Sequence, residues 1–194
     1  MKKVMLLMGS PRKHGNTAFV AQQVLESMAE IEEIAVEYVD CARLGNKPRG
    51  CAACYRCRPM KFRCAISDAT AEVINRLADY DVVLLATPVY FFNFSAQLKS
   101  VTDRFQALVD YDEKGRMVTP LKTVRFGCIA TSEGNAESSG VEVVDLSLKY
   151  LAQYAGLKKI PMLHQITGGT DLTVVEQDRT LDRRAIAFAK KLMK

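Results

Sequence analysis

The sequence predicts a doubly wound α/β fold, with five parallel strands in the order 2-1-3-4-5 and helices on both faces of the sheet. Short apolar segments alternate along the chain with longer segments of helical periodicity. The segment Asp81–Ala86, with its core VVLLA, is apolar at consecutive positions, as in a strand that is covered on both faces. A polar loop directly follows the first apolar segment, where sheets of this type bind ligands.

Each element is assigned from its pattern of apolar residues. Strands, which are short apolar runs, are predicted at Lys3–Met8, Ile34–Val39, Asp81–Ala86, Lys122–Ala130 and Leu157–Leu163. Helices, in which apolar residues recur every three or four positions, are predicted at Thr17–Ala29, Ala71–Ala78, Ser95–Val109, Val141–Tyr154 and roughly Glu176–Met193. No repeat or low-complexity linker interrupts this order. We therefore expect residues 1–194 to form a single domain, with an irregular cysteine-rich loop at 41–68.

The composition indicates a globular protein. The chain has 194 residues, of which 48% are hydrophobic, enough for a sizeable core. The N-terminal run VMLLM is shorter than the apolar region of a secretory signal, which has roughly 7–15 residues. No segment approaches the roughly 20 apolar residues of a spanning helix. We expect a cytoplasmic protein without membrane attachment, in a reducing compartment where clustered cysteines more often serve metal or redox chemistry than disulfides.

Four of the six cysteines are close together in the sequence. Cys51, Cys54, Cys57 and Cys64 have the spacing C-x2-C-x2-C-x6-C. Thiolates are the ligands of iron–sulfur clusters, and three of them two residues apart can converge on one inorganic core. Structural zinc sites usually present two separated cysteine pairs, so iron–sulfur is favoured over zinc. Free thiols remain a further interpretation.

The same segment carries much of the positive charge of a chain whose net charge is +5. No acidic residue occurs between Asp40 and Asp68, and the basic residues of this stretch include Lys47, Arg49, Arg56, Arg58, Lys61 and Arg63. Such a run is often a solvated surface. Here it would also stabilise an anionic cluster and attract an acidic electron donor. Nucleic-acid binding is disfavoured, because no basic stripe or reader motif accompanies the patch.

The first polar loop, GSPRKHGNT, lacks the spacing of a Walker A motif and of G-x-G-x-x-G. It offers the Ser10 and Thr17 hydroxyls, the Asn16 amide, the Arg12 cation and the free N–H groups of a following helix. These groups suit a terminal phosphate monoester. The alternative is a helix start without a ligand, in which Asn16 serves as the N-cap. The loop alone leaves both interpretations open.

Two further loops follow apolar strands at the same predicted edge. In the segment TPVYFFNF, three aromatic residues come directly after a proline and a buried strand. Backbone amides and ring faces there suit a flat isoalloxazine, although an apolar turn covering the sheet edge is a serious alternative. The loop TSEGNAESSG offers Thr131, Ser132 and Gly134 to a ring or ribityl chain. Its alternative is a solvated loop.

With these motifs in view, the chain resembles the iron–sulfur flavoproteins, within the NADPH-dependent FMN reductase group of flavodoxin-like proteins. The resemblance is carried by GSPRKHGN, by the cysteine motif, by TPVYFFNFSAQLK followed by DR, and by a late GGT. These elements occur in family order and span nearly the whole chain. The phosphate and PVY motifs are shared by the whole flavodoxin-like group, so the cysteines alone indicate the iron–sulfur branch.

The resemblance implies specific roles for residues of this chain. The FMN phosphate would be bound by Ser10, Arg12, Asn16 and Thr17. The flavin would be faced by Pro88, Val89, Tyr90, Phe91 and Asn93, and the site closed by Thr131, Ser132 and Gly134. A [4Fe–4S] cluster would be bound by Cys51, Cys54, Cys57 and Cys64. The family also implies a homodimer or homotetramer.

The sequence thus predicts an FMN-dependent oxidoreductase that passes electrons between the cluster and FMN. No side chain is assigned a catalytic role, because the flavin carries the chemistry. NAD(P)H or a ferredoxin-type protein is the expected donor, and a small molecule is the expected acceptor. Two alternatives stay open: a cluster-free NAD(P)H-dependent FMN or quinone reductase, and a flavodoxin-like electron carrier without turnover.

Overall fold

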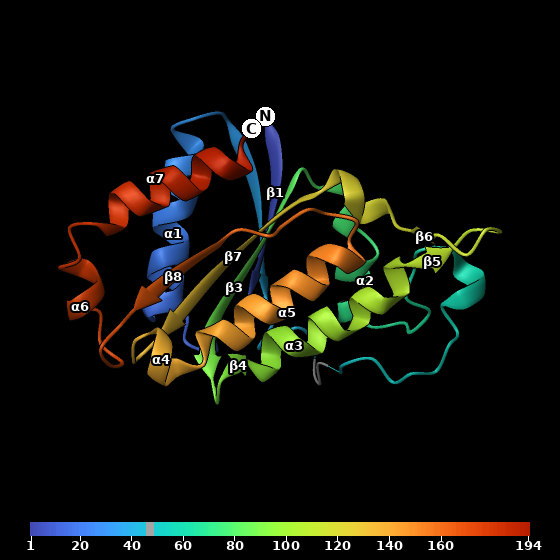
Figure 1. The fold of residues 1–194 in the computed structure, drawn as a ribbon, viewed down its shortest axis with the longest axis horizontal. Coiled ribbons are helices and arrows are strands. Elements are labelled where there is room, and N and C mark those ends of the chain that lie inside the picture. The colour runs from blue at the N-terminus through green and yellow to red at the C-terminus, as the bar shows by residue number, and fades with distance from the viewer. Residues whose placement is uncertain (46–48) are drawn as a thin grey trace.

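The computed structural model describes residues 1–45 and 49–194. Five parallel strands form the main sheet in the order β2-β1-β3-β7-β8 (Figure 1). Their bounds are β1 Lys2–Met8, β2 Ile34–Asp40, β3 Val82–Tyr90, β7 Arg125–Ser132 and β8 Met162–Ile166. In order of sequence these are strands 2-1-3-4-5, so the predicted doubly wound topology is confirmed.

Helices cover both faces of this sheet, as predicted (Figure 1). One face packs against α1, Asn16–Ala29, and α7, Leu181–Leu192. The other face is covered by three helices: α2 Ala69–Ile74, α3 Ala96–Thr102 and α5 Val141–Tyr154. The remaining elements are short: α4 Ala136–Ser139, α6 Thr173–Glu176, β4 Asn93–Phe94, β5 Asp110–Tyr111, β6 Met117–Val118, and the 3-10 helices η1 Arg58–Met60, η2 Leu77–Asp79, η3 Asp103–Leu108 and η4 Pro120–Thr123.

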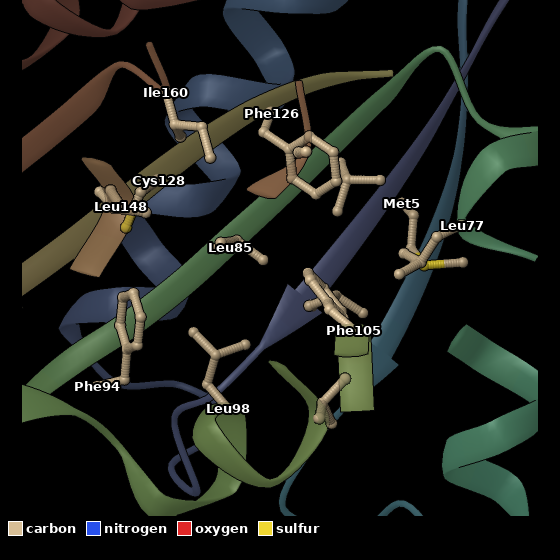
Figure 2. Close-up of a cluster of buried hydrophobic side chains, with 14 of the residues drawn as sticks. Met5, Leu77, Leu85, Phe94, Leu98, Phe105, Phe126, Cys128, Leu148 and Ile160 are labelled. Carbon is tan, nitrogen blue, oxygen red and sulfur yellow. The ribbon is translucent and has the colours of Figure 1, made fainter. Parts of the chain in front are cut away.

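The alternation of side chains along each strand divides the core into two layers. On β3, Val83 and Leu85 point to the layer under α2, α3 and α5, whereas Leu84 and Ala86 point to the layer under α1 and α7. Figure 2 shows Leu85 among side chains of the first layer, including Leu98 from α3. Because both faces are covered, the central strands read as continuous apolar runs, which is why the sequence revealed them.

The predicted final helix at Glu176–Met193 is wrong in one respect, because it is two helices, α6 and α7. The interruption lies at Asp178. Its carboxylate accepts hydrogen bonds from the amide and the hydroxyl of Thr180, at 2.9 and 2.7 Å, and such local bonds compete with helix continuation. The predicted helix at Ser95–Val109 also changes character, since α3 ends at Thr102 and continues as the 3-10 helix η3.

The cysteine-rich segment is irregular, as expected, apart from the single 3-10 turn η1. In Figure 1 this teal turn lies beside β5 and β6, beyond the end of η3. Lys47, one of the basic residues of the segment, lies outside the described residues. Across residues 1–45 and 49–194, the structure contains no helix with the length and apolar character needed to span a membrane.

Replacement of Leu85 tests the packing of the central strand. Leu85 is fully buried, so Leu85→Ala removes apolar contacts and leaves a cavity that the surrounding helices fill only in part. We expect the free energy of unfolding to fall by about 2–5 kcal/mol. Chemical denaturation measures this change, with Glu113→Ala, at an exposed position, as the control. A loss below about 1 kcal/mol would contradict the described packing.

Candidate functional site

Four loops meet where the parallel strands end and enclose a cavity of about 180 Å³. They follow β1, β3, β7 and β8, so residues far apart in the sequence lie together. The cavity is lined by Ser10, Arg12, Gly15, Asn16, Thr17, Pro88, Val89, Tyr90, Thr131, Ser132, Glu133, Thr167, Gly169 and Thr170. This is the switch point of the sheet. The chain passes from β1 to β2 on one side and from β3 to β7 on the other, so the loops after β1 and β3 lead in opposite directions and a crevice opens between them.

The loop after β1 is held tightly against the start of α3. The Ser95 hydroxyl donates to the Gly9 carbonyl at 2.8 Å, and the Gly9 amide donates to the Ala86 carbonyl at 2.7 Å. A Cβ atom at Gly9 would lie only 2.7 Å from the Ser95 hydroxyl oxygen and from the Leu98 Cβ. Only glycine therefore allows this close approach, which fixes the direction in which the loop leaves the sheet.

Helix α1 begins at the cavity with its amide groups directed to its own N-terminus, where partial positive charge accumulates. The N-cap is Gly15, so the interpretation of Asn16 as the N-cap is wrong: Asn16 is the first helical residue. No side chain caps this end and no acidic residue occupies its first turn. With the Arg12 cation also lining the cavity, the arrangement suits an anionic group.

Asn16 is buried between two loops. Its Nδ2 donates to the Gly169 carbonyl at 3.2 Å, which ties α1 to the loop after β8. Its Oδ1 is buried and has no hydrogen-bond partner within the described part of the chain. A buried acceptor without a donor costs about 1–3 kcal/mol. A ligand that carries hydroxyl donors would remove this cost.

The floor of the cavity contains buried hydroxyl groups in a hydrogen-bonded network. The Thr17 and Thr131 hydroxyls lie 2.7 Å apart, which joins α1 to the end of β7. The Ser132 hydroxyl donates to the Gly134 carbonyl at 2.7 Å and lies 2.6 Å from His164 Nε2. Burial, and secondarily the Arg184 cation, lower the pKa of His164, so this imidazole is neutral at pH 7 and adds no charge to the network.

The aromatic segment forms a tight hairpin turn beside the cavity. β4 pairs with β3 in antiparallel fashion, with Tyr90 opposite Asn93, so Phe91 and Phe92 are the two turn residues. Both have positive φ, 45° and 70°, a conformation usually left to Asn and Gly in such turns. Their rings project outward, with 94% and 52% of their surface exposed. Two strained, exposed phenylalanines are costly for an isolated chain.

The structure brings together nine of the twelve residues that the sequence assigned to the flavin. These are Ser10, Arg12, Asn16, Thr17, Pro88, Val89, Tyr90, Thr131 and Ser132. The other three do not line the cavity: Phe91 points outward, Asn93 accepts from the Phe94 amide at 2.7 Å, and Gly134 lies behind Ser132. Sequence reasoning missed Gly15, Glu133, Thr167, Gly169 and Thr170. The late GGT was the available signal, since it follows the last strand.

The four cysteines of the motif occupy one neighbourhood. Cys51 and Cys54 are exposed, and Cys57 and Cys64 are partly buried. Burial raises the pKa of the Cys57 thiol, and the neighbouring Cys64, Cys51 and Cys54 raise it further. Cys51 and Cys57 also line a cavity of about 740 Å³ between this segment and η3.

The backbone of this segment is unusual. Ala53 and Tyr55, on either side of Cys54, have φ of 48° and 55°, and Lys61 and Phe62 have φ of 42° and 65°. Each such conformation costs about 1–3 kcal/mol for a residue other than glycine. Strained backbone of this kind persists where other interactions hold the chain in place. Thiolate bonds to a shared inorganic core would do so.

The geometry of a metal site is nevertheless not preformed. Within residues 1–45 and 49–194, no three His, Cys, Asp or Glu side chains are close enough together to hold a metal ion. The donor set is soft and thiol-rich, as an iron–sulfur cluster requires. The residues therefore fit such a cluster in type, and the loop would have to bring their sulfurs together to bind it.

The two remaining cysteines are core residues. Cys41 and Cys128 are fully buried, as the sequence indicated. Burial, followed by the charge of Asp40, raises the pKa of the Cys41 thiol to about 12, and burial likewise raises the pKa of Cys128. Both are neutral at pH 7 and act as small apolar side chains.

The strand order, the crevice at the switch point and the anion-suited start of α1 together define a flavodoxin-like protein class. The sequence profile of the NADPH-dependent FMN reductases matches residues 2–162, most of the chain. The chain therefore belongs to the NADPH-dependent FMN reductase family, a family of FMN-dependent oxidoreductases.

Curated relatives of the chain include proteins named iron–sulfur flavoproteins. An iron–sulfur flavoprotein of Methanocaldococcus jannaschii is 36% identical over 106 residues, which are 55% of this chain and 53% of that protein. An iron–sulfur flavoprotein of Archaeoglobus fulgidus is 22% identical over 200 residues, covering 98% of this chain and 94% of the relative. In its most similar matches, the chain spans about half the length of the curated relatives.

Solved structures share the fold over its whole length. An FMN-dependent NADH-azoreductase from Bacillus anthracis, in complex with FMN, superposes with a TM-score of 0.71 at 16% identity, covering 100% of both chains. An NAD(P)H:quinone oxidoreductase from Methanothermobacter marburgensis gives a TM-score of 0.69 at 14% identity, over 100% of this chain and 96% of that one. At these identities the likeness concerns the fold alone.

Proposed function

We propose that this protein is an FMN-dependent oxidoreductase that passes electrons between FMN and a [4Fe–4S] cluster. The observation that carries the flavin assignment is the cavity at the switch point, where the start of α1, Arg12 and buried hydroxyls converge. The family profile and the curated relatives support the same cofactor. Bound FMN supplies the redox chemistry, and the chain supplies binding, orientation and electrostatics.

The residues around the cavity divide into three groups by chemistry. Ser10, Arg12, Asn16 and Thr17 hold the phosphate with hydroxyls, a cation and the amide groups at the start of α1. Asn16 Oδ1 lacks a partner among the described residues and would accept a hydrogen bond from a hydroxyl of the bound flavin. The ring is bordered by Pro88, Val89 and Tyr90, with Phe91 and Asn93 in the adjacent turn, and by Thr131 and Ser132, with Gly134 behind them.

The cluster would be held by Cys51, Cys54, Cys57 and Cys64. Their closeness in the sequence, the positive φ angles around Cys54 and the names of the curated relatives support this assignment. Basic residues of the same segment, such as Arg56 and Arg58, would offset the negative charge of a thiolate-ligated cluster.

The donor is NAD(P)H or a ferredoxin-type protein, the acceptor is a small molecule, and the setting is a reducing cytoplasm. Two of the solved relatives with this fold carry NADH or NAD(P)H in their names, which supports a nicotinamide donor. One specific observation favours a second function, a cluster-free NAD(P)H-dependent FMN or quinone reductase: the four thiols are not arranged as a preformed metal site in the described part of the chain.

Asn16→Leu tests the flavin site. The substitution removes a buried amide from the cavity and places an apolar side chain where polar ligand atoms would lie, so we expect FMN affinity to fall about 10–100-fold. Fluorescence titration of the flavin-free protein with FMN measures this. Gln22→Leu, at an exposed position of the same helix, is the control and should bind FMN as the wild type does. Equal affinity in both variants, or release of FAD on heating, would contradict the assignment.

The exposed phenylalanine turn supports a homodimer or homotetramer. Phe92 lies close to the start of α5, because a Cβ at Gly140 would lie 2.7 Å from the Phe92 Cβ, and the Phe91 ring lies beside that of Phe92. Further along α5, Val143, Leu146 and Tyr150 are also exposed, at the spacing of one helix face. This surface of apolar residues beside the cavity would be covered by a second copy of the chain.

Phe91→Glu tests this assembly. A charge on the exposed turn would have to be desolvated in the interface, so we expect the variant to dissociate at micromolar concentrations at which the wild type remains an oligomer. Light scattering coupled to size exclusion measures the mass. Tyr38→Ser, at an exposed position on the opposite edge strand β2, should leave the mass unchanged. A monomeric wild type would overturn the proposal.

Cys54→Ala separates the cluster-containing oxidoreductase from the cluster-free reductase. We expect the variant to lose the cluster and at least about tenfold in the rate of flavin reduction by reduced ferredoxin, while FMN stays bound and hydride transfer from NAD(P)H survives. The reason is that the flavin cavity and the cysteine cavity share no lining residue. Anaerobic stopped-flow spectroscopy measures both rates, with Cys41→Ala as the matched control. Equal ferredoxin rates in the wild type and Cys54→Ala would remove the cluster from the mechanism.

A further inference from the structure

A buried arginine reaches the fourth cysteine of the motif. Arg104, in η3, has only 1% of its surface exposed. Its Nη2 donates a hydrogen bond to Cys64 Sγ at 2.9 Å. Arginine remains protonated at every accessible pH, so this is a permanent positive charge in contact with a sulfur.

The position of Arg104 is fixed from its other side by Asp68. Arg104 Nη1 donates to both carboxylate oxygens of Asp68, at 2.8 and 2.7 Å. Asp68 is itself the N-cap of α2 and accepts from the Ala71 amide at 2.8 Å. The guanidinium group therefore lies between α2 and η3, and its orientation toward Cys64 is set by the folded core.

The backbone of Cys64 is held separately by Asn75, which follows α2. The Cys64 amide donates to Asn75 Oδ1 at 2.7 Å, and Asn75 Nδ2 donates to the Cys64 carbonyl at 3.3 Å. Cys64 is thus attached to the domain through both its main chain and its sulfur. Cys51 and Cys54, in contrast, are exposed in the irregular loop.

One donor of Arg104 remains unused. Its Nε is buried and has no hydrogen-bond partner within the described part of the chain. A purely structural ion pair with Asp68 gives no reason to bury this third donor or to direct Nη2 at a sulfur. A sulfur-rich, negatively charged group beside Cys64 would accept hydrogen bonds from both Nε and Nη2.

We propose that Arg104 is a positioning residue of the cluster site, which holds the Cys64 sulfur as the first, fixed ligand and raises the reduction potential of the bound cluster. The inference rests on the proposed cluster function and assigns a residue outside the cysteine motif to it. One-electron reduction by an external donor makes the cluster more negative. A cation that donates to a ligand sulfur stabilises that state more than the oxidised one.

The experiment compares Arg104→Gln, Arg104→Lys and the wild type, each reconstituted with iron and sulfide under anaerobic conditions. Iron and sulfide content and the midpoint potential of the cluster, followed by electron paramagnetic resonance during a redox titration, are measured. Arg76→Gln is the matched control: Arg76 also donates to both oxygens of a carboxylate, Glu37, at 3.0 and 2.8 Å. Its only hydrogen bonds in the described part of the chain are to oxygen atoms.

We expect Arg104→Gln to lower the ratio of reduced to oxidised cluster about tenfold at a fixed applied potential, which corresponds to a negative shift of about 59 mV. Arg104→Lys keeps the charge but loses the paired donors of the guanidinium group, so its shift in midpoint potential should be smaller. The midpoint potential of Arg76→Gln should match that of the wild type. If Arg104→Gln does not fold, the midpoint potential of Arg104→Lys is compared with that of the wild type instead. A cluster with an unchanged potential in the folded Arg104 variants would overturn the inference alone. A wild type that takes up no iron or sulfide would overturn the proposed function and the inference with it.

Discussion

The pairing of β3 between β1 and β7 is the constraint on which the flavin cavity, the switch-point cavity proposed to bind FMN, depends. In this register Met8 lies opposite Ala86, and Pro88 lies opposite Thr131. The loops that follow these strands therefore emerge at the same level of the sheet, and β8 adds a further loop beside them. The Gly9 amide bond to Ala86 and the Ser95 bond to Gly9 continue the pairing past the end of β1. A register shift of one residue in β7 would turn the Thr131 side chain to the other face of the sheet, away from the Thr17 hydroxyl that it contacts.

The sequence predicted the fold well because burial on both faces leaves a simple signature. Central strands such as β3 are continuous apolar runs, and α5 was predicted with the bounds observed, Val141–Tyr154. The errors occurred where tertiary or local polar contacts determine where a helix begins or ends. The break before α7 depends on the Asp178 carboxylate, and the N-cap of α1 is Gly15, a residue without a side chain that could signal it. Neither feature belongs to the periodic pattern of apolar residues from which helices are predicted.

The cavity residues were predictable only as far as they follow strands. Residues at the carboxyl ends of β3 and β7 and in the loop after β1 line the cavity as expected, because parallel strands end at a common edge. The Phe91–Phe92 turn was not predictable, since two phenylalanines with positive φ contradict the usual preferences of a tight hairpin. The contact between Arg104 and Cys64 spans 40 positions of sequence and arises only from the packing of η3 against α2.

The continuous segment from α3 to η3 connects the two sites. At its start, Ser95 caps α3 and binds the loop of the flavin cavity through Gly9; at its far end, Arg104 binds Cys64. Ser95 and Arg104 are nine positions apart, roughly 14 Å at the rise of an α-helix. Because this segment packs in the core through Leu98 and Phe105, the two sites are held at a fixed separation although they share no lining residue. The cysteine segment can therefore vary in sequence without disturbing the flavin cavity, whereas a change that shifts α3 would affect both sites at once.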